Sequence, residues 1–357
     1  MTKQFDAIVF NGRFQPLHLG HIDVIRRAGE LAEKVFVIVG SSHQPRSFKN
    51  PFTFRERKQL ILKSCSGLVE SLRVIPNYDT LNNDDTWADN VYRLVSEETE
   101  YNDKIAIIGH KKDDSSFYLD MFPKWELVKV PLFNNLSATP IREQYFKYHG
   151  ENYGPGCNPK NYSHVAPEPA IDFLVEFMET EEYQEIVRER ASIEKYKSQY
   201  AMLPFPPTFV TVDALVVHNG HVLMVERKNE PGRGLWALPG GFLDARTDRS
   251  LEAAMFRELK EETHLDITGR MMGTHVFDSV DRSSRGRTIT HAFHMVIDSN
   301  LPRPEVIPGD DAKSAAWIPA EKINPSKCFE DHYEIINHFL RIRDITNYFE
   351  ELWNETI

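Results

Sequence analysis

The sequence predicts an α/β protein with two domains of different construction, joined by a helical connector. The chain has 357 residues, which exceeds the usual size of one hydrophobic core. Over its first half, short apolar runs alternate with amphipathic stretches, as is typical of a parallel sheet with helices on both faces. The second half begins with a hairpin pattern and ends in helices, so it predicts a separate core of mixed type.

Five buried strands are expected in the first half. Apolar runs lie at 5–10, 34–40, 71–77, 104–110 and 125–131, with amphipathic stretches at 21–32, 54–65 and 87–98 between the first four. This order predicts a doubly wound, Rossmann-like parallel sheet over residues 1–165. A loop-like segment at 151–170, rich in Gly, Pro and Asn, ends the domain.

The rest of the chain divides into a connector and a second domain. Two charged helices are expected over 170–200, and three prolines within 204–207 stop them. We therefore expect residues 166–206 to form a helical connector and residues 207–357 to form the second domain. Its first feature is a hairpin in which Asn219-Gly220 suits a tight turn.

Charge and cysteine usage limit the class of protein. Residues 1–160 carry 21 basic and 20 acidic side chains, whereas the remaining 197 carry 21 and 33, within a formal net charge of -11. The acidic half argues against a nucleic-acid-binding surface and suits divalent cations. Three scattered cysteines, no signal peptide and no long apolar segment indicate a soluble, cytoplasmic protein without a membrane partner. A homo-oligomer is left open.

The first candidate site is GRFQPLHLGH, which follows the first predicted strand. Ligands of parallel sheets bind outside the carboxyl ends of the strands, where backbone N–H groups and a helix N-terminus attract phosphate. Gly12 permits close approach to a phosphate, Phe14 follows in the same turn, and Arg13, His18 and His21 supply donors. The alternative, that both histidines merely cap a helix or lie on a solvated face, stays open.

Two later segments add candidate phosphate ligands. In SATPIR, Ser137 or Thr139 can cap a helix while Arg142 faces a triphosphate, although an ordinary helix start has the same pattern. Gly109, His110 and Lys111 lie at the end of the fourth strand. The alternative for Lys111 is a solvated charge pair with Lys112.

Three motifs in matching order identify a family. GRFQPLHLGH resembles the HxGH signature of the nucleotidyltransferase superfamily, in particular the archaeal-type nicotinamide mononucleotide (NMN) adenylyltransferases. KNPFTFRER resembles their NPFT loop, and SATPIR resembles their late Ser/Thr-x-x-Arg motif. The resemblance implies adenylyl transfer from ATP to NMN, giving NAD and pyrophosphate. Catalytic groups would be His18, His21, Arg13 and Arg142, with Mg²⁺ or Mn²⁺ on the leaving group.

The same resemblance implies the acceptor site. Trp87 would stack on the nicotinamide ring, with Lys49, Asn83 and Asp84 as further ligands of the nucleotide, since an indole face attracts a pyridinium cation. The alternatives are a core tryptophan on an amphipathic helix, and a transferase for another phosphate acceptor such as phosphopantetheine.

The second candidate site is RELKEE, in which Glu258, Glu261 and Glu262 share one helix face. Carboxylates so close repel one another, so they invite a divalent cation, unless the run is merely a solvated face. The segment resembles the Nudix box, with three departures. Arg249 stands in place of a glutamate, Gly241 lies one or two residues too far upstream, and His264 replaces a glycine. Asp248 is a candidate replacement for the missing carboxylate.

The Nudix resemblance implies an α/β/α sandwich that binds Mg²⁺ or Mn²⁺ through Glu258, Glu261 and Glu262 and hydrolyses ADP-ribose to AMP and ribose 5-phosphate. The expected ADP-ribose ligands are Arg227, Trp236, Gly241, Arg282, Arg285 and Arg287. Exposed loop arginines are the alternative for the last three. The whole order of parts resembles the bacterial bifunctional NMN adenylyltransferase/ADP-ribose pyrophosphatases. An adenylyltransferase whose Nudix domain senses ADP-ribose without cleaving it is the rival hypothesis.

Overall fold

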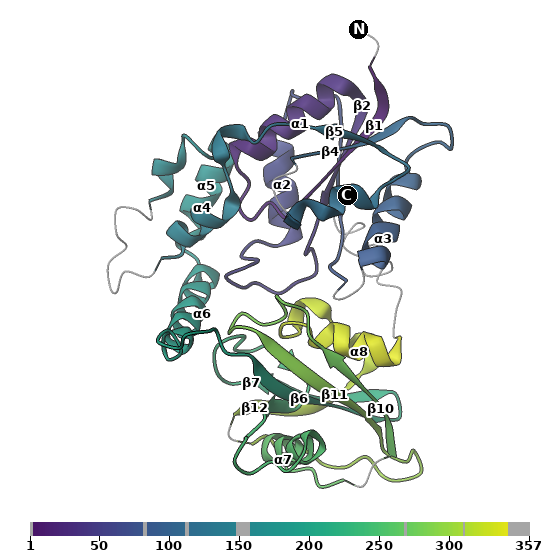
Figure 1. The fold of residues 1–357 in the computed structure, drawn as a ribbon, viewed down its shortest axis with the longest axis vertical. Helices are drawn as coiled ribbons and strands as arrows, with labels where there is room; N and C mark the ends of the chain where they lie inside the picture. The colour runs from purple at the N-terminus through teal and green to yellow at the C-terminus, as the bar shows by residue number, and fades with distance from the viewer. Residues whose placement is uncertain are drawn as a thin grey trace. The chain divides into compact units, whose positions relative to one another are not determined.

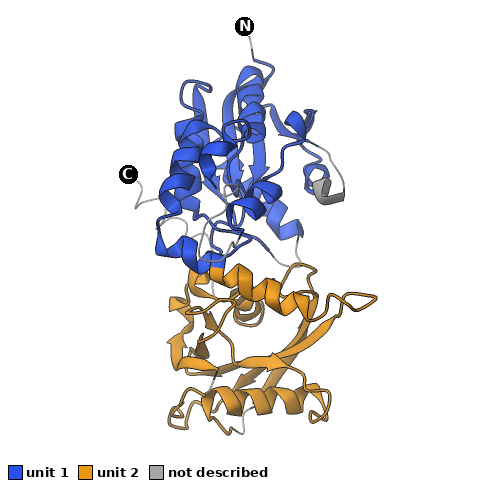
Figure 2. Ribbon diagram, turned by 90° about the vertical axis from the view of Figure 1, so that its left-hand side faces the viewer, with its two compact units in different colours: residues 1–187 blue, residues 188–357 orange. Residues whose placement is uncertain are grey.

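The chain folds as two compact units, Met1–Val187 and Arg188–Ile357 (Figure 2). The computed structural model describes residues 3–80, 84–110, 114–147, 158–267, 270–309 and 311–341. Each unit has its own sheet and its own hydrophobic core. The predicted α/β class, with two domains of different construction, is confirmed.

The first unit contains a five-stranded parallel sheet in the order β3-β2-β1-β4-β5 (Figure 1). The strands are β1 (Phe5–Gly12), β2 (Ala32–Val39), β3 (Ser71–Pro76), β4 (Ile105–Gly109) and β5 (Glu126–Lys129). All four pairings are parallel, as predicted. The chain builds β1 to β3 toward one edge and then crosses to β4, which creates a ligand-binding switch point beside the carboxyl end of β1.

Helices cover both faces of this sheet. They are α1 (Leu19–Leu31), α2 (Phe54–Ser64), α3 (Asp84–Ser96) and α4 (Ala138–Tyr145). Successive side chains of β1 point to opposite faces. Ile8 and Phe10 join the core with α1, α2 and α4, whereas Ala7 and Val9 join the core beneath α3.

The two charged helices expected after the first domain are α5 (Glu168–Phe177) and α6 (Glu181–Ser198). Leu174 and Phe177 of α5, with Tyr183 and Ile186 of α6, are buried in the first core. The early part of the expected connector therefore belongs by packing to the first unit, and the boundary between the units falls inside α6.

The second unit contains a mixed seven-stranded sheet in the order β10-β11-β6-β7-β12, to which β8 and β9 add short pairings with β7 and β6. The strands are β6 (Phe209–His218), β7 (His221–Arg227), β8 (Trp236–Ala237), β9 (Gly240–Phe242), β10 (Arg270–Phe277), β11 (Thr288–Val296) and β12 (Ala312–Pro319). Asn219 and Gly220 join β6 to β7 with positive φ values of 47° and 71°, as a tight hairpin requires.

Helices α7 (Leu251–Thr263) and α8 (His332–Leu340) lie on opposite sides of this sheet (Figure 1), so the predicted sandwich is confirmed. Ala254, Met255 and Leu259 of α7 pack against buried residues of β6 and β7. None of the helices in the described ranges is both long enough and apolar enough to cross a membrane.

Candidate active sites

Two adjoining cavities open at the carboxyl ends of the strands in the first unit. The histidine cavity, of about 350 Å³, is lined by His18 and His21 among others, and the tryptophan cavity, of about 440 Å³, is lined by Trp87. Asn11, Gly12, Arg13 and Tyr118 line both cavities. Two ligands bound side by side would therefore meet at the end of β1.

His18 and His21 face the histidine cavity and also cap α1. The His18 backbone N–H donates to His21 Nδ1 at 3.2 Å, and the two rings stack with centroids 3.6 Å apart. Burial lowers the pKa of His18 to about 4, and burial together with the charge of His18 lowers the pKa of His21 well below its usual range. Capping and cavity lining thus coexist, and both imidazoles are neutral near pH 7.

The glycine turn after β1 is shaped by an aromatic ring. Phe14 has a left-handed backbone, with φ of 54°, and a Cβ at Gly12 would lie 2.9 Å from its ring. The turn leaves Arg13 exposed, where the two cavities meet. Any residue larger than glycine at position 12 would displace the Phe14 ring, which forms part of the cavity wall.

Arg57, which sequence reasoning missed, holds the turn in place. Its guanidinium donates to the carbonyls of Arg13, Gly40 and Ser41 at 2.7–3.1 Å, and to that of Thr53 at 3.2 Å. The side chain is 1% exposed, and burial lowers its pKa to about 9. The sequence signal was present, since Arg57 ends the quoted KNPFTFRER segment, but nothing local shows that it points inward.

The N-terminus of α4 opens onto the histidine cavity. Ser137 occupies the N-cap position without a side-chain capping bond, and Ser137, Thr139 and Arg142 all line the cavity. Arg142 Nη1 donates to the carbonyl of Gln15 at 2.7 Å. The helix terminus and Arg142 therefore present positive potential to this cavity.

Of the residues predicted at the end of β4, one lines a cavity in the described ranges. His110 lines the histidine cavity, with Nδ1 3.0 Å from the Val130 carbonyl. Gly109 packs beneath Leu119, where a Cβ would approach to 2.8 Å, so its role there is close packing. Lys111 lies outside the described residues.

The predicted acceptor residues divide between the tryptophan cavity and other positions. Asp84 and Trp87 line the cavity, and the Trp87 indole also packs edge-on against Tyr118 and Phe122. Core packing and cavity lining again coexist. Lys49 is exposed in the loop before α2 and is not part of either lining, and Asn83 lies outside the described residues. Sequence reasoning missed Asn11, Asn77 and Asp79, which complete the polar wall.

A third cavity, of about 340 Å³, lies in the second unit and is lined by Glu258 and Glu262 of α7; we call it the carboxylate cavity. Burial raises the pKa of Glu262 to about 8, and Glu258 adds to the shift, while a hydrogen bond from the Gly240 N–H at 3.0 Å opposes it. Burial also raises the pKa of Glu258. Glu261 does not line the cavity; its side chain is 59% exposed and pairs with Arg257 at 2.9 Å.

A divalent cation fits the donors of the carboxylate cavity. Two partly buried carboxylates with raised pKa values face one space, and a cation would offset both their loss of solvent and their mutual repulsion. Gly241 brings the backbone close to Glu258, since a Cβ there would lie 2.6 Å from the carboxyl atoms. Within the described ranges, no three His, Cys, Asp or Glu side chains are arranged to hold a metal ion.

The irregular positions of the Nudix box are explained by the structure. Arg257 donates to both oxygens of Asp248, so a carboxylate of the loop before α7 contacts the arginine of the box, while Arg249 is exposed. His264 ends α7 in the left-handed conformation, φ 53°, that usually favours glycine. Its Nδ1 lies 3.0 Å from the Ile307 carbonyl.

Three of the expected ADP-ribose arginines line the carboxylate cavity, in two different ways. Arg227 lies over the Phe329 ring at 4.0 Å, and Arg285 lies 5.0 Å from the Phe242 ring centroid. Arg282 instead forms a bidentate ion pair with Asp331, in which both side chains are at most 3% exposed. Gly241 lines the cavity, whereas Trp236 and Arg287 are partly buried outside its lining.

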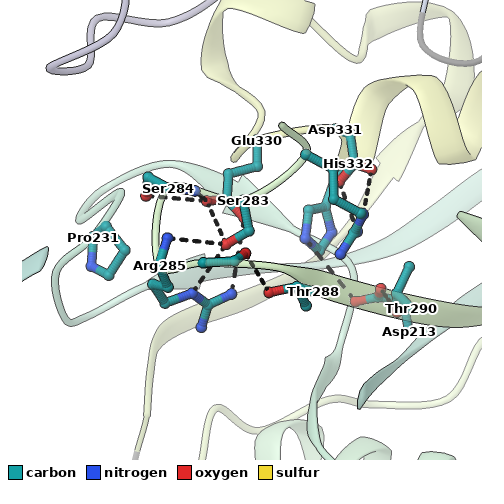
Figure 3. A network of polar contacts seen from close by, with 12 residues as sticks. Asp213, Pro231, Ser283, Ser284, Arg285, Thr288, Thr290, Glu330, Asp331 and His332 are labelled. Carbon is teal, nitrogen blue, oxygen red and sulfur yellow. Dashed lines mark hydrogen bonds and ion pairs between the residues drawn. The ribbon is translucent and has the colours of Figure 1, made fainter. Parts of the chain in front are cut away.

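Sequence reasoning also missed the buried polar network behind the arginines (Figure 3). His332 Nδ1 accepts from the Leu238 N–H at 2.9 Å, and its Nε2 lies 4.0 Å from Asp213. Burial lowers the pKa of His332 to about 4, while burial raises that of Asp331 against the opposing charge of Arg282. The network joins the N-terminus of α8 to β6 across more than a hundred residues, and the EDH segment at 330–332 was its sequence signal.

Comparisons with known proteins match each unit separately and the chain as a whole. Residues 9–143 match the Cytidylyltransferase-like family model and residues 207–339 match the NUDIX domain model. A nicotinamide/nicotinic acid mononucleotide adenylyltransferase of Acinetobacter baylyi is 35% identical over 55% of this chain and 96% of its own length. An ADP-ribose pyrophosphatase of Methanocaldococcus jannaschii is 35% identical over 37% of this chain and 73% of its own length.

Two crystal structures match both units at once. They are of a bifunctional NMN adenylyltransferase/ADP ribose pyrophosphatase from Francisella tularensis, one of them complexed with AMP and a Mn ion. Each is 37% identical to this chain and covers 94% of it and 99% of its own chain, with TM-scores of 0.84 and 0.83.

Proposed function

The chain belongs to the family of bifunctional NMN adenylyltransferase/ADP-ribose pyrophosphatases, and we propose that each unit carries one of the two activities. The first unit transfers an adenylyl group from ATP to NMN, giving NAD and pyrophosphate. The second unit hydrolyses ADP-ribose to AMP and ribose 5-phosphate. The observation that supports the first assignment is the pair of cavities that meet at Gly12 and Arg13, because adenylyl transfer needs two nucleotides with their phosphates in contact.

In the first site, ATP occupies the histidine cavity and NMN occupies the tryptophan cavity. An oxygen of the NMN 5′-phosphate attacks the α-phosphorus of ATP in line, a new P–O bond forms, and the bond to the bridging oxygen of pyrophosphate breaks. His18, His21 and Arg142 donate hydrogen bonds to the triphosphate. Arg13 binds the NMN phosphate and the α-phosphate of ATP where the two meet. The attacking oxygen is already ionised, so positioning and charge stabilisation account for catalysis.

The test of the first activity is NAD formation from ATP and NMN by the purified full chain. A panel of other phosphate acceptors, including phosphopantetheine, is assayed in parallel. Adenylylation of another acceptor, with no NAD formed, would reject the assignment of NMN.

In the second site, Glu258 and Glu262 would hold the divalent cation, which would neutralise charge on the diphosphate and lower the pKa of the attacking water. Arg227 and Arg285, which line the same cavity, bind the diphosphate or stack on adenine. The Arg257–Asp248 pair fixes the carboxylate face of α7 despite the irregular box, which supports hydrolysis over mere ADP-ribose sensing. AMP release from ADP-ribose distinguishes the two, since a sensor would bind the ligand without cleaving it.

The family resemblance and the Mn ion in a related structure indicate dependence on a divalent metal. We propose Mg²⁺ as the ion at both sites, with Mn²⁺ as a substitute. Chelation should abolish both activities. Stepwise return of Mg²⁺ or Mn²⁺ should then show which ion restores each activity at the lower concentration. We also propose a cytoplasmic location, and small molecules rather than nucleic acid or membrane as partners. In the described ranges Cys65 and Cys328 are buried free thiols, which suits a reducing compartment.

A further inference from the structure

Asn11 is a polar residue inside an otherwise apolar strand. It is the seventh residue of β1, pairs in register with Ile38 of β2, and is 7% exposed. Neither Oδ1 nor Nδ2 has a hydrogen-bond partner among the described residues. An unsatisfied buried amide is unfavourable, and an apolar side chain of similar shape would fill the position without that cost. The amide therefore suits a ligand group that is present when the enzyme works.

The geometry of β1 directs this amide toward the tryptophan cavity. Ala7 and Val9 pack in the core beneath α3, and alternation places Asn11 on that same face of the sheet. Trp87 and Tyr118 pack against this core and line the tryptophan cavity together with Asn11. Asn11 thus lies in the wall of the space assigned to the nicotinamide nucleotide.

A second amide lies in the same wall. Asn77, which follows β3, is 1% exposed and lines the tryptophan cavity. Its Oδ1 accepts from the Tyr78 N–H at 2.9 Å, whereas its Nδ2 has no partner in the part of the chain that the structure describes. The free groups of these two amides are therefore one acceptor, Oδ1 of Asn11, and two donors, Nδ2 of Asn11 and Nδ2 of Asn77.

The chemistry of the wall selects one kind of ligand group. We propose that Asn11 is a specificity-determining residue, which pairs through Oδ1 and Nδ2 with the carboxamide of NMN and thereby disfavours nicotinic acid mononucleotide. A primary carboxamide presents one donor and one acceptor, so it matches a second amide in a two-bond pair. A carboxylate presents acceptors alone, and would set an anionic oxygen against Oδ1.

The charges of the tryptophan cavity favour the same choice. Among the described residues, Asp79 and Asp84 line it with carboxylates, and Arg13 lines it with a guanidinium. Asp79 is held in place by hydrogen bonds from the backbone N–H and the hydroxyl of Ser41. This balance suits a pyridinium ring with a neutral amide, and it opposes the additional negative charge of the acid form.

The inference rests on the proposed adenylyltransferase activity. One set of assays distinguishes a failure of the role of Asn11 from a failure of that activity. The full chain is assayed with ATP and either NMN or nicotinic acid mononucleotide, as wild type and as Asn11→Leu. The matched control is Asn90→Leu, because Asn90 of α3 is also a buried amide whose Nδ2 has no partner in the described ranges, yet it does not line either cavity.

Asn11→Leu should lower kcat/KM for NMN by about 10- to 100-fold, mainly through KM, because two hydrogen bonds are lost. The value for nicotinic acid mononucleotide and the KM for ATP should change by less than about threefold, and Asn90→Leu should leave the preference unchanged. An equal loss with both acceptors, or no loss with NMN, overturns the role of Asn11. Absence of NAD formation by the wild type would instead overturn the proposed function itself.

A second measurement does not depend on how well Asn11→Leu folds. The mononucleotide of 3-acetylpyridine keeps the carbonyl of NMN but has a methyl group in place of the amide nitrogen. The wild type should use it about tenfold less well than NMN, because Oδ1 of Asn11 loses its donor. Equal use of the two by the wild type contradicts the pairing.

Discussion

Arg257 donates hydrogen bonds to both carboxylate oxygens of Asp248, at 2.9 Å from Nε and 2.8 Å from Nη2. The same guanidinium contacts Glu258 and Glu261, so it joins the loop before α7 to the acidic face of the helix. The hydrogen bonds from Arg257 lower the pKa of Asp248 to about 2, so the pair stays charged throughout the neutral range.

Removal of this carboxylate should impair hydrolysis. We expect Asp248→Ala to lower ADP-ribose hydrolysis by about 10- to 100-fold, because Arg257 would lose the anchor that positions it against Glu258. AMP formation at saturating metal measures the effect. Arg249→Ala is the matched control, since Arg249 is exposed one residue further on. Equal activity of the two variants would show that the Asp248 pair is not needed for catalysis.

The adjacent glutamates Glu261 and Glu262 of α7 should differ in importance. Glu262→Gln should reduce hydrolysis by about 100-fold or more and weaken Mn²⁺ binding, because Glu262 lines the cavity. Glu261→Gln should have a much smaller effect, because Glu261 is outside the cavity lining and pairs with Arg257. Titration with Mn²⁺ followed by calorimetry gives affinity independently of turnover. NAD formation by the first unit serves as the control for the amount of active protein, and similar losses in both variants would restore Glu261 as a ligand.

The clamp made by Arg57 should be needed for the shape of the first site. Arg57→Lys keeps the charge but cannot reach four carbonyls, so we expect a loss of about 3 kcal/mol in the free energy of unfolding and a rise in KM for both nucleotides. Urea unfolding and NAD formation measure the two effects. Arg55→Lys, at an exposed position of the same helix, should be silent. A silent Arg57→Lys would mean that the turn after β1 holds its shape unaided.

Acid should destabilise the first unit through His18. Burial lowers its pKa in the folded chain to about 4, whereas an unfolded histidine titrates near 6.5. Between these values the unfolded chain binds more protons, so stability falls as the pH decreases through this window, by about 3 kcal/mol in total. Urea unfolding from pH 7 to 4, followed by hydrogen-exchange labelling of the β1 peptide, measures the slope of the free energy of unfolding against pH. His18→Asn should have a shallower slope, and an unchanged slope would assign the effect to other groups.

Much of the fold could be predicted because its signals are local. Each parallel strand is a continuous apolar run, and Asn219-Gly220 sets its hairpin with two residues. The histidines of the first site are three residues apart, so one helix start brings them together. Helix periodicity likewise placed Glu258 and Glu262 on one face.

The remainder of the sites depends on partners that are distant in the sequence. Periodicity groups Glu261 with its neighbours, but it does not show that Arg257 would draw that side chain away from the cavity. Arg282 has the same local signature as Arg285, yet Asp331, 49 residues later, buries it in an ion pair. In the sequence, Asn11 is only a polar residue near the end of a strand. The packing of α3 on Ala7 and Val9 is needed to show which face of the sheet its amide occupies.

The wall shared by the histidine and tryptophan cavities also bears on how the first reaction ends. Because Asn11, Gly12 and Arg13 border both spaces, the dinucleotide product would span them as one continuous molecule. Its two halves are tethered, so each raises the effective concentration of the other at its own subsite. Accumulated NAD should therefore compete against ATP and against NMN alike, and its departure, rather than bond formation, would then limit turnover in a cell rich in the finished cofactor.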